Sequence, residues 1–288
     1  MFPIRDHNPS ERRPFVTWAL IAINAVVFLS YFPASGGQEY LLMAFYDQWA
    51  LVPAEVSRGQ ELHTLVTSMF LHGGWMHIIG NMLFLYIFGD NLEDQLGHVG
   101  YLLFYLLGGL AAGLAQVLAG PTSQIPMVGA SGAIAGVMGG YLVLFPRARV
   151  DIALVLFVFF KIVTVPAWLM LGFWFALQLG NGAASDGASG GVAYWAHAGG
   201  FVAGVLLILP AWLRRGGPAF WQRTHGLPPH AERMRRPSQR VMSPPDTPTA
   251  PRRRGEPPPI PGSESPTRVP RAGARRQDRN SPWGGSRR

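Results

Sequence analysis

Three groups of polar residues lie in otherwise apolar stretches of the sequence, where a polar side chain is costly unless it has a role. They are His72, His77 and Asn81 in one stretch, Ser131 in a second and His197 in a third. A serine hydroxyl becomes a nucleophile when an imidazole within hydrogen-bonding reach accepts its proton, and nearby N–H groups can stabilise the oxyanion that forms. The residue types therefore indicate serine-based acyl transfer at Ser131, if the chain brings the three groups together.

Ser131 and His197 are expected at the same depth in a membrane. Ser131 lies sixteen residues before Arg147, and His197 lies seventeen residues before Arg214, and each arginine marks the end of an apolar run. At about 1.5 Å per helical residue, both lie roughly 24–26 Å from that end. Because a hydrocarbon core is about 30 Å thick, both side chains should lie just below the opposite surface.

Each of these two stretches also carries glycines spaced four residues apart. Such small-residue rows let two helix backbones approach closely. We expect this approach to bring the Ser131 hydroxyl within reach of the His197 imidazole. The rows are Gly132, Gly136 and Gly140 in one helix and Gly200 and Gly204 in the other.

Ser131 stands at the expected start of a helix that is too short to cross the membrane. Residues 131–145 make about 22 Å of helix, and Pro146 follows them. The N–H groups of the first turn would then point into the site, where the Ser131 N–H could stabilise an oxyanion. His77 and Asn81 are four residues apart and share a helix face, so their side chains could complete the oxyanion hole.

Six apolar runs approach the roughly 20 residues that a spanning helix needs, which predicts an all-α, polytopic membrane protein with a bundle of six helices. No convincing cleavage site accompanies the first run, so we expect it to be retained. Arginines before the first run and after the fourth and sixth place both termini in the cytoplasm. The runs are about 15–32, 75–89, 100–118, 131–145, 162–180 and 193–213.

Residues 150–160 are apolar but precede Lys161, and a single helix continuing from 152 to 180 would bury that lysine. We expect an interfacial segment there, with Lys161 snorkelling at its end and Pro166 near the start of the fifth helix.

The charge divides the chain into a short N-terminal segment (1–14), a helical domain (15–214) and a basic tail (215–288). The tail has sixteen arginines against five acids, whereas residues 1–214 have eight basic and eleven acidic side chains. Because the tail is rich in Pro, Arg, Ser and Gly, we expect it to be disordered. Its nearest polyanion would be anionic lipid of the cytoplasmic leaflet, so no specific nucleic-acid binding is expected. Cysteine is absent, which excludes disulfides.

Three motifs in order resemble the rhomboid family of intramembrane serine proteases. They are HGGWMHIIGNM at 72–82, GASGAIAG at 129–136 and AHAGGFVAG at 196–204, which match the family patterns H-x4-H-x3-N, G-x-S-G and A-H-x2-G-x3-G. The resemblance covers about residues 15–214. It implies an endopeptidase that cleaves transmembrane segments of other membrane proteins, needs no cofactor and lies in a membrane as a multi-pass protein, which we expect to be the plasma membrane of a bacterium.

The resemblance implies a role for each residue that matches the motifs. Ser131 and His197 would form a catalytic dyad, with His77, Asn81 and the Ser131 N–H as the oxyanion hole. Glu93 corresponds to an acidic position that ties down the first loop region. The residues with an expected structural role near the site are His72, Gly129, Gly132, Gly200, Gly204 and Glu93.

The sequence departs from the family at two places. The Trp-Arg pair often found in the first loop is replaced, with His63 and Thr64 near its position. The tyrosine that stacks on the catalytic imidazole in some members is Ala135 here, so another group must orient His197. Asp186 lies in a nearby loop, where an acid is usually only solvated.

Four other interpretations fit the sequence less well. A catalytically inactive rhomboid-like protein would bind membrane clients without cutting them, but such relatives typically lack the dyad. A transporter would need charged side chains along its spans to form an ion path, and the six runs lack them. A metal site at His63, His72 and His77 lacks an HExxH motif and suitable carboxylates. Gly89-Asp90 is similar to an aspartyl intramembrane protease motif, but a second aspartate in a span is missing.

Overall fold

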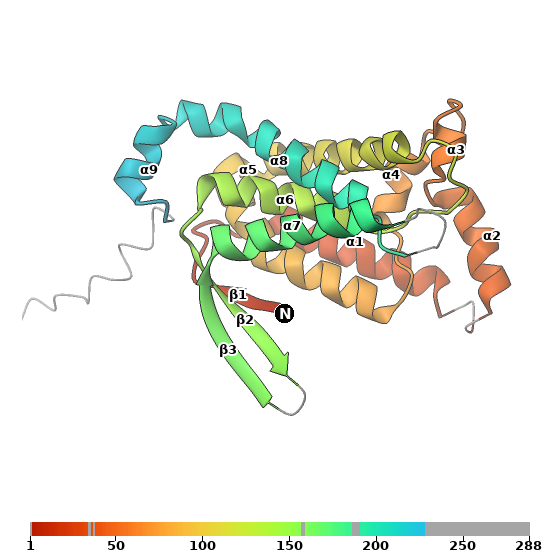
Figure 1. Ribbon diagram of the computed structural model, residues 1–288, viewed down its shortest axis with the longest axis horizontal. Coiled ribbons are helices and arrows are strands. Elements are labelled where there is room, and N and C mark those ends of the chain that lie inside the picture. The colour runs from red at the N-terminus through yellow and green to blue at the C-terminus, as the bar shows by residue number, and fades with distance from the viewer. Residues whose placement is uncertain (1, 34–35, 37, 157–158, 186–190, 228–288) are drawn as a thin grey trace, which may run out of the picture. The chain divides into compact units, whose positions relative to one another are not determined.

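The computed structural model describes residues 2–33, 36, 38–156, 159–185 and 191–227. Five helices form the body of this part (Figure 1). They are α1 (Phe15–Tyr31), α5 (Trp75–Ala119), α6 (Ser131–Leu144), α7 (Ala167–Ala184) and α8 (Tyr194–Arg214). Between α1 and α5 lie four short elements, α2 (Glu39–Trp49), α3 (Pro53–Val56), α4 (Thr64–Thr67) and the 3₁₀ turn η1 (Ser68–Phe70).

The helix α6 forms the centre of the bundle. Every residue from Gly132 to Tyr141 is buried, and α6 packs against both α5 and α8. A helix that is apolar and buried on all sides is typical of a core position. Ser131, its first residue, is therefore held by the most enclosed element of the fold.

Helices occupy most of all six apolar runs, although α5 covers two of them and the first five residues of the run at 162–180 belong to a strand. Gly97 interrupts α5 with φ 71° and ψ 166°, a left-handed backbone that glycine adopts without strain. Only α5 and α8 are long and apolar enough, by length and composition, to cross a membrane in the described part of the chain. The structure therefore shows a mostly helical protein and does not confirm the expected count of six spans.

Most of the segment expected to be interfacial, residues 150–160, belongs to two paired β-strands. Strand β2 (Arg149–Leu156) pairs antiparallel with β3 (Phe159–Pro166), and β1 (Phe2–Asp6) adds to the free edge of β2. Runs rich in Val, Ile and Phe favour strands, and pairing satisfies the backbone groups of both segments. The helix α7 begins directly after Pro166, as the sequence predicts.

A buried carboxylate joins the strands. Asp151 on β2 accepts hydrogen bonds from Arg5 Nε at 2.7 Å and Thr164 Oγ1 at 2.6 Å, and lies 2.9 Å from His7 Nε2. Burial by itself would raise the pKa of Asp151, but the hydrogen bonds from Thr164, Arg5 and His7 hold it well below its ordinary value. The N-terminal strand is thus fastened to the hairpin by a charged group.

Glu93 does not tie down the first loop region, contrary to the expectation from the resemblance. Its carboxylate accepts hydrogen bonds from the backbone N–H groups of Val16 and Thr17 and from the Thr17 hydroxyl, all at 2.8 Å. His98 Nδ1 lies 2.6 Å from the same carboxylate. The first N–H groups of a helix have no partner within it, so Glu93 caps the start of α1.

The tail is folded at its beginning, so disorder from residue 215 was wrong for that part. Helix α9 (Pro218–Thr224) follows α8, and Phe220 is buried. Trp221 Nε1 donates to the Val143 carbonyl at 2.8 Å, and Arg147 N donates to the Gly226 carbonyl at 3.0 Å. Residues 228–288, expected to be disordered, lie outside the described residues, as does Asp186.

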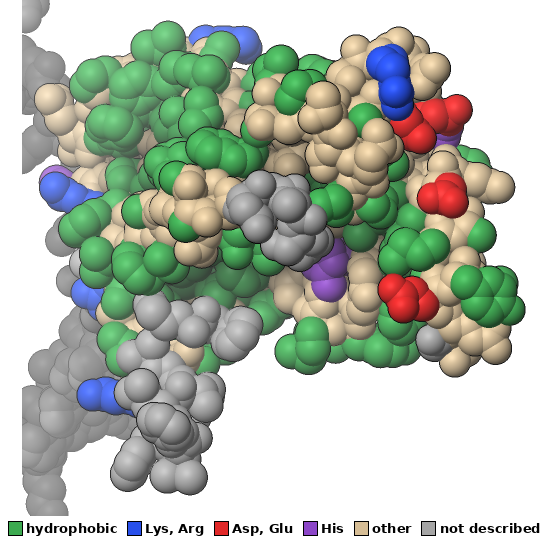
Figure 2. Space-filling view, turned by 45° about the vertical axis from the view of Figure 1, so that its right-hand side comes forward, with side chains coloured by type: hydrophobic (Ala, Val, Ile, Leu, Met, Phe, Trp, Pro, Cys, Tyr) green, Lys and Arg blue, Asp and Glu red, His purple; other side chains and the backbone are tan. Residues whose placement is uncertain are grey.

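Charged side chains gather at two ends of the described part. Figure 2 shows acidic side chains over α2 and α3 and most of the visible Lys and Arg side chains at the opposite end. Hydrophobic side chains cover much of the surface between them, and large ones are exposed on α1, α5, α7 and α8. An apolar belt between charged ends suits a protein embedded in hydrocarbon.

Candidate active site

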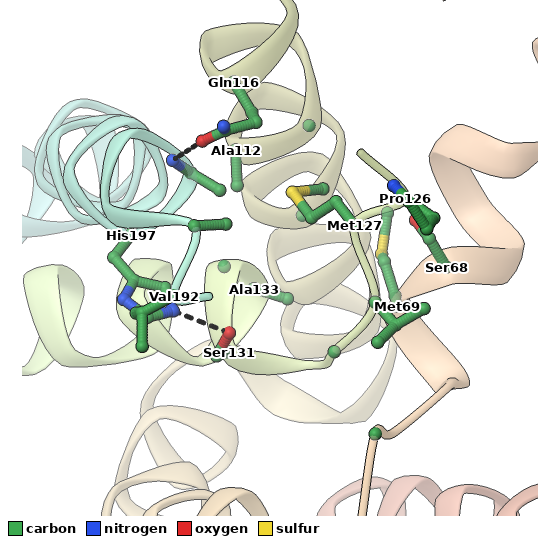
Figure 3. Close-up of a pocket in the computed structure, with 18 of the residues that line it drawn as sticks. Ser68, Met69, Ala112, Gln116, Pro126, Met127, Ser131, Ala133, Val192 and His197 are labelled. Atoms are coloured by element: carbon green, nitrogen blue, oxygen red, sulfur yellow. Dashed lines mark hydrogen bonds between the residues drawn. The ribbon is translucent and has the colours of Figure 1, made fainter. Parts of the chain in front are cut away.

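Ser131 and His197 line one cavity of about 380 Å³, together with His77 and Asn81. The cavity lies among α5, α6, the start of α8 and the loop before Ser131, and Figure 3 shows its lining. The four side chains come from three helices separated by many residues in the sequence. The structure therefore brings together the groups that the sequence analysis selected.

The Ser131 hydroxyl is hydrogen-bonded to the His197 imidazole. Ser131 Oγ lies 2.7 Å from His197 Nε2, and the dashed line in Figure 3 marks this contact. A serine and a histidine at this distance have the geometry in which an imidazole can accept the hydroxyl proton during attack.

The close contact between α6 and α8 makes this distance possible. A Cβ atom added at Gly200 would collide with the Gly132 carbonyl oxygen, and one added at Gly204 would collide with the Gly136 carbonyl oxygen. No side chain larger than hydrogen fits at either place. The two glycine rows lie against each other at the contact that positions Ser131 and His197.

Two residues of α7 contact the far side of the His197 ring. His197 Nδ1 lies 2.9 Å from Gln178 Oε1, and the Trp174 ring lies 5.8 Å away at an interplanar angle of 33°. Neither residue was predicted from the sequence. A glutamine within an apolar span is nevertheless a signal of the same kind as the serine and histidines, because burying any polar side chain there is costly. In a chain with Ala135 at the position of the stacking tyrosine, these two residues contact the imidazole instead.

Gln116 on α5 was also missed. Its Oε1 accepts a hydrogen bond from the Ala196 N–H at 3.1 Å, in the first turn of α8 (Figure 3). This bond fixes the residue immediately before His197. The start of α8 is therefore anchored to α5 as well as to α6.

The His77 ring presents a donor to the cavity. The Gly73 N–H donates to His77 Nδ1 at 3.3 Å, so in the neutral ring the hydrogen is carried by Nε2. That atom lies close to Gly129, because a Cβ added there would lie 2.8 Å from it. Gly129 has φ 134°, a backbone conformation suited to glycine in this tight approach.

Asn81 supplies a second donor. Its side chain is buried, and its Nδ2 has no hydrogen-bond partner among the described residues. A buried amide N–H₂ without a partner is costly, so its presence in a cavity suggests a partner that arrives later. Ser131, at the start of α6, adds a backbone N–H that its own helix does not use.

His72 lies beside the site rather than in it. Its side chain is fully buried, and its ring centroid lies 5.0 Å from that of His77. The His72 carbonyl accepts hydrogen bonds from the hydroxyls of Tyr31 at 2.7 Å and Tyr46 at 3.2 Å. His72 therefore joins α1 and α2 to the segment that holds His77.

The loop between α1 and α5 is fastened without a Trp-Arg pair. His63 Nε2 lies 3.0 Å from the Gln48 carbonyl, and Thr67 Oγ1 donates to the Trp49 carbonyl at 2.7 Å. Both contacts reach the end of α2.

Across the described residues, no group of three or more His, Asp or Glu side chains could hold a metal ion.

The helical architecture and apolar surface indicate a membrane protein, with a hydrogen-bonded serine and histidine in a cavity among its helices. A family model of the Rhomboid domain matches residues 59–214, more than half of the chain. The chain belongs to the rhomboid family.

Relatives come from organelles and from a bacterium. Rhomboid-like protein 11, chloroplastic, of Arabidopsis thaliana is 32% identical over 133 residues, 46% of this chain and 42% of its own. Rhomboid protein 1, mitochondrial, of Saccharomyces cerevisiae is 31% identical over 198 residues, 66% of this chain and 51% of its own. A Bacillus subtilis protein provisionally named rhomboid protease YdcA is 32% identical over 130 residues, 45% of this chain and 61% of its own.

These matches cover less than two thirds of each relative's length. Because chloroplastic and mitochondrial proteins are among them, the comparisons do not support a bacterial plasma membrane in particular.

Proposed function

We propose that the chain is an intramembrane serine endopeptidase that cleaves transmembrane segments of other membrane proteins. The observation that carries this proposal is the 2.7 Å contact between Ser131 Oγ and His197 Nε2, inside a cavity that also holds spare N–H donors. Family membership supports it, since rhomboid-like proteins include proteases.

In this mechanism His197 accepts the Ser131 proton while Oγ attacks a substrate carbonyl carbon. The negative charge moves to the carbonyl oxygen, where the Ser131 N–H, His77 Nε2–H and Asn81 Nδ2–H₂ donate to it. His197 then returns the proton to the leaving amine as the peptide bond breaks. Water, activated by the same imidazole, hydrolyses the acyl-enzyme and frees the serine.

The chain would then cross the membrane six times, with α5 counted as two crossings that meet at Gly97. Both termini and the β-sheet would then lie on the cytoplasmic side, with α2 and the acidic surface on the outer side. Ser131 would lie just below the outer surface. Substrates would be cut near that surface at small or helix-weakening residues, because unwinding a helix in lipid leaves backbone groups unpaired at several kcal/mol each.

Lipids are the second proposed class of partner. The arginine-rich tail would lie beside the cytoplasmic leaflet, where each basic residue adds about 1 kcal/mol of attraction to an anionic surface.

A rhomboid-like protein that binds membrane clients without cutting them is the alternative. The test is labelling of the purified protein in detergent by a fluorophosphonate, which reacts with activated serines. We expect labelling of the native protein and none of Ser131→Ala or His197→Ala. Ser30→Ala, an exposed serine on α1, is the matched control and should label as the native protein does. A folded native protein that neither labels nor cleaves any transmembrane substrate would support the binding alternative.

A further inference from the structure

Gln178 lies on α7, near the end of the helix that approaches the cavity. Its side chain is 8% exposed, whereas those of the flanking Leu177 and Leu179 are 44% and 40% exposed. The helix therefore turns one polar side chain inward and directs the neighbouring leucines outward. A buried amide is retained where its hydrogen bonds are made, so the partners of Gln178 indicate its role.

Both ends of the Gln178 amide have a partner. Nε2 donates to the Trp174 carbonyl at 3.2 Å, one helical turn earlier, and Oε1 lies 2.9 Å from His197 Nδ1. Turning the amide over would place its oxygen against the Trp174 carbonyl oxygen, two acceptors without a hydrogen between them. The backbone of α7 therefore fixes which end of the amide faces the histidine.

This orientation determines where His197 carries its proton. An amide oxygen only accepts, so the hydrogen between it and the ring must belong to Nδ1. In the neutral ring Nε2 then has no hydrogen and can accept one from Ser131 Oγ, which lies 2.7 Å away. The opposite tautomer would direct an N–H at the serine hydroxyl and leave Nδ1 facing an acceptor.

We infer that Gln178 is a positioning residue that holds His197 in the tautomer able to deprotonate Ser131, as the third member of a Ser131–His197–Gln178 chain. This inference rests on the proposed function and extends it beyond a two-residue dyad. The Trp174 ring restricts rotation of the imidazole from one side, and Gln178 sets its protonation pattern. When the imidazole gains a second proton during attack, the Gln178 oxygen keeps its hydrogen bond to Nδ1–H.

The first test reads the tautomer in the unaltered protein. Histidine labelled with ¹⁵N is observed in detergent above pH 8, and the His197 signals are assigned by their loss in His197→Gln. We expect the hydrogen on Nδ1 and an unprotonated Nε2. A hydrogen on Nε2 overturns the inference, whether or not the protein cleaves anything.

The second test compares two variants of similar length. Gln178→Met keeps the shape but loses the acceptor, whereas the protonated carboxyl of Gln178→Glu can donate to the Trp174 carbonyl while its other oxygen accepts from His197 Nδ1. We expect kcat of Gln178→Met to fall about 10–100-fold with KM nearly unchanged, as is typical when an orienting hydrogen bond to a histidine is lost. Gln178→Glu should recover most of that loss, and the Nδ1–H signal should weaken only in Gln178→Met.

The control is Leu177→Ala on the exposed face of the same helix, which should cleave as the native protein does. Thermal unfolding in detergent establishes that each variant is folded. A native kcat in Gln178→Met, or an equal loss in folded Gln178→Glu, overturns the role of the acceptor. Failure of the proposed function is a separate result, because the native protein would then neither label with fluorophosphonate nor cleave.

Discussion

Gly204 on α8 lies directly against the backbone carbonyl of Gly136 on α6. A Cβ atom added at Gly204 would overlap the Gly136 carbonyl oxygen, carbon and Cα atoms, all of which belong to rigid backbone. The two helices can therefore keep this spacing only while residue 204 has no side chain. Ser131 and His197 lie at the starts of the same two helices, so their hydrogen bond depends on that spacing.

Gly204→Ala should separate α6 from α8 and remove most of the activity. Overpacking a core typically costs about 1–3 kcal/mol, and here the obstacle is backbone that cannot rotate away. We expect a lower thermal midpoint and at least a tenfold loss of fluorophosphonate labelling. Gly172→Ala on α7 is the control, because a Cβ there would meet nothing within 4 Å. Native labelling in Gly204→Ala would mean that the helix spacing does not set the serine–histidine distance.

Asn81→Ala should reduce kcat more than it changes KM. Its Nδ2 has no partner among the described residues, so the donor is free to stabilise the oxyanion that forms during the reaction. Loss of one oxyanion donor typically costs about 10²–10³ in rate, and the Ser131 N–H and His77 would remain. We therefore expect the lower end of that range, measured by steady-state cleavage in detergent.

Asn24→Ala provides the comparison for Asn81. Asn24 is also buried in a helix, but its Nδ2 donates within α1 to the Leu20 carbonyl at 2.8 Å. This variant should lose stability without a specific loss of kcat at a permissive temperature. Equal kcat values for Asn81→Ala and the native protein would make Asn81 a packing residue.

Glu93→Gln should destabilise the protein without altering the site. The two carboxylate oxygens of Glu93 accept hydrogen bonds from Val16 N, Thr17 N and Thr17 Oγ1 and contact His98. The amide of glutamine has only one oxygen that can accept. A hydrogen bond to a charged group contributes about 1.5–3 kcal/mol, so we expect a loss of about 2–3 kcal/mol in the free energy of unfolding. Glu39→Gln, at the exposed start of α2, should cost less than about 0.5 kcal/mol. A native thermal midpoint in Glu93→Gln would contradict the capping role.

Much of the helical arrangement could be predicted because membrane spans have a strong sequence signal. The runs beginning at Phe15, Ser131 and Ala193 start within one residue of the observed helices. The hairpin could not be predicted in the same way, because a short apolar run fits a strand, an interfacial segment or a buried helix equally well. The pairing of β2 with β1 on one edge and with β3 on the other shows that this run is a strand.

Some residues of the candidate site could be predicted from the sequence and others could not. Ser131, His197, His77 and Asn81 stand in short motifs with fixed spacing, whereas Gln178 contacts His197 only through the packing of α7 on α8. A glutamine nineteen residues before the histidine has no spacing signal. The partners of Glu93 were likewise decided by how the chain folds, since Thr17 lies 76 residues away.

Asp6 should make the stability of the folded chain fall as pH rises from about 4 to about 7. Burial, and then the neighbouring Asp90, raise the pKa of Asp6 from 3.8 to about 7, although hydrogen bonds from Tyr141 and the Asn8 backbone oppose the shift. In the unfolded chain this carboxyl ionises near pH 4. Between the two values the folded state binds a proton that the unfolded state has released, so the free energy of unfolding decreases with pH.

The measurement is the thermal midpoint in detergent at a series of pH values. Asp6→Asn cannot titrate at this position, so its midpoint should depend less on pH in this window than that of the native protein. Asp47→Asn, an exposed aspartate on α2, should follow the native curve. Parallel curves for Asp6→Asn and the native protein would exclude the buried carboxyl as the cause.

Truncation should separate the folded beginning of the tail from the remainder. Removing residues 228–288 takes away most of the tail arginines but leaves α9, so stability and cleavage should stay within about twofold of native while binding to anionic vesicles weakens.

Removing residues 215–288 also deletes Phe220, which is buried, and the Trp221 bond to the Val143 carbonyl near the end of α6. Burial of a phenylalanine contributes about 1.5–3 kcal/mol and a neutral hydrogen bond about 0.5–1.5 kcal/mol. The shorter protein should therefore unfold at a lower temperature. It should still cleave when kept cool, because Ser131 and His197 lie at the N-terminal ends of α6 and α8, away from the contact that α9 makes near the end of α6. Equal stability of the two truncations would show that α9 is not part of the folded domain, and loss of cleavage on removing 228–288 alone would assign the distal tail a role in catalysis.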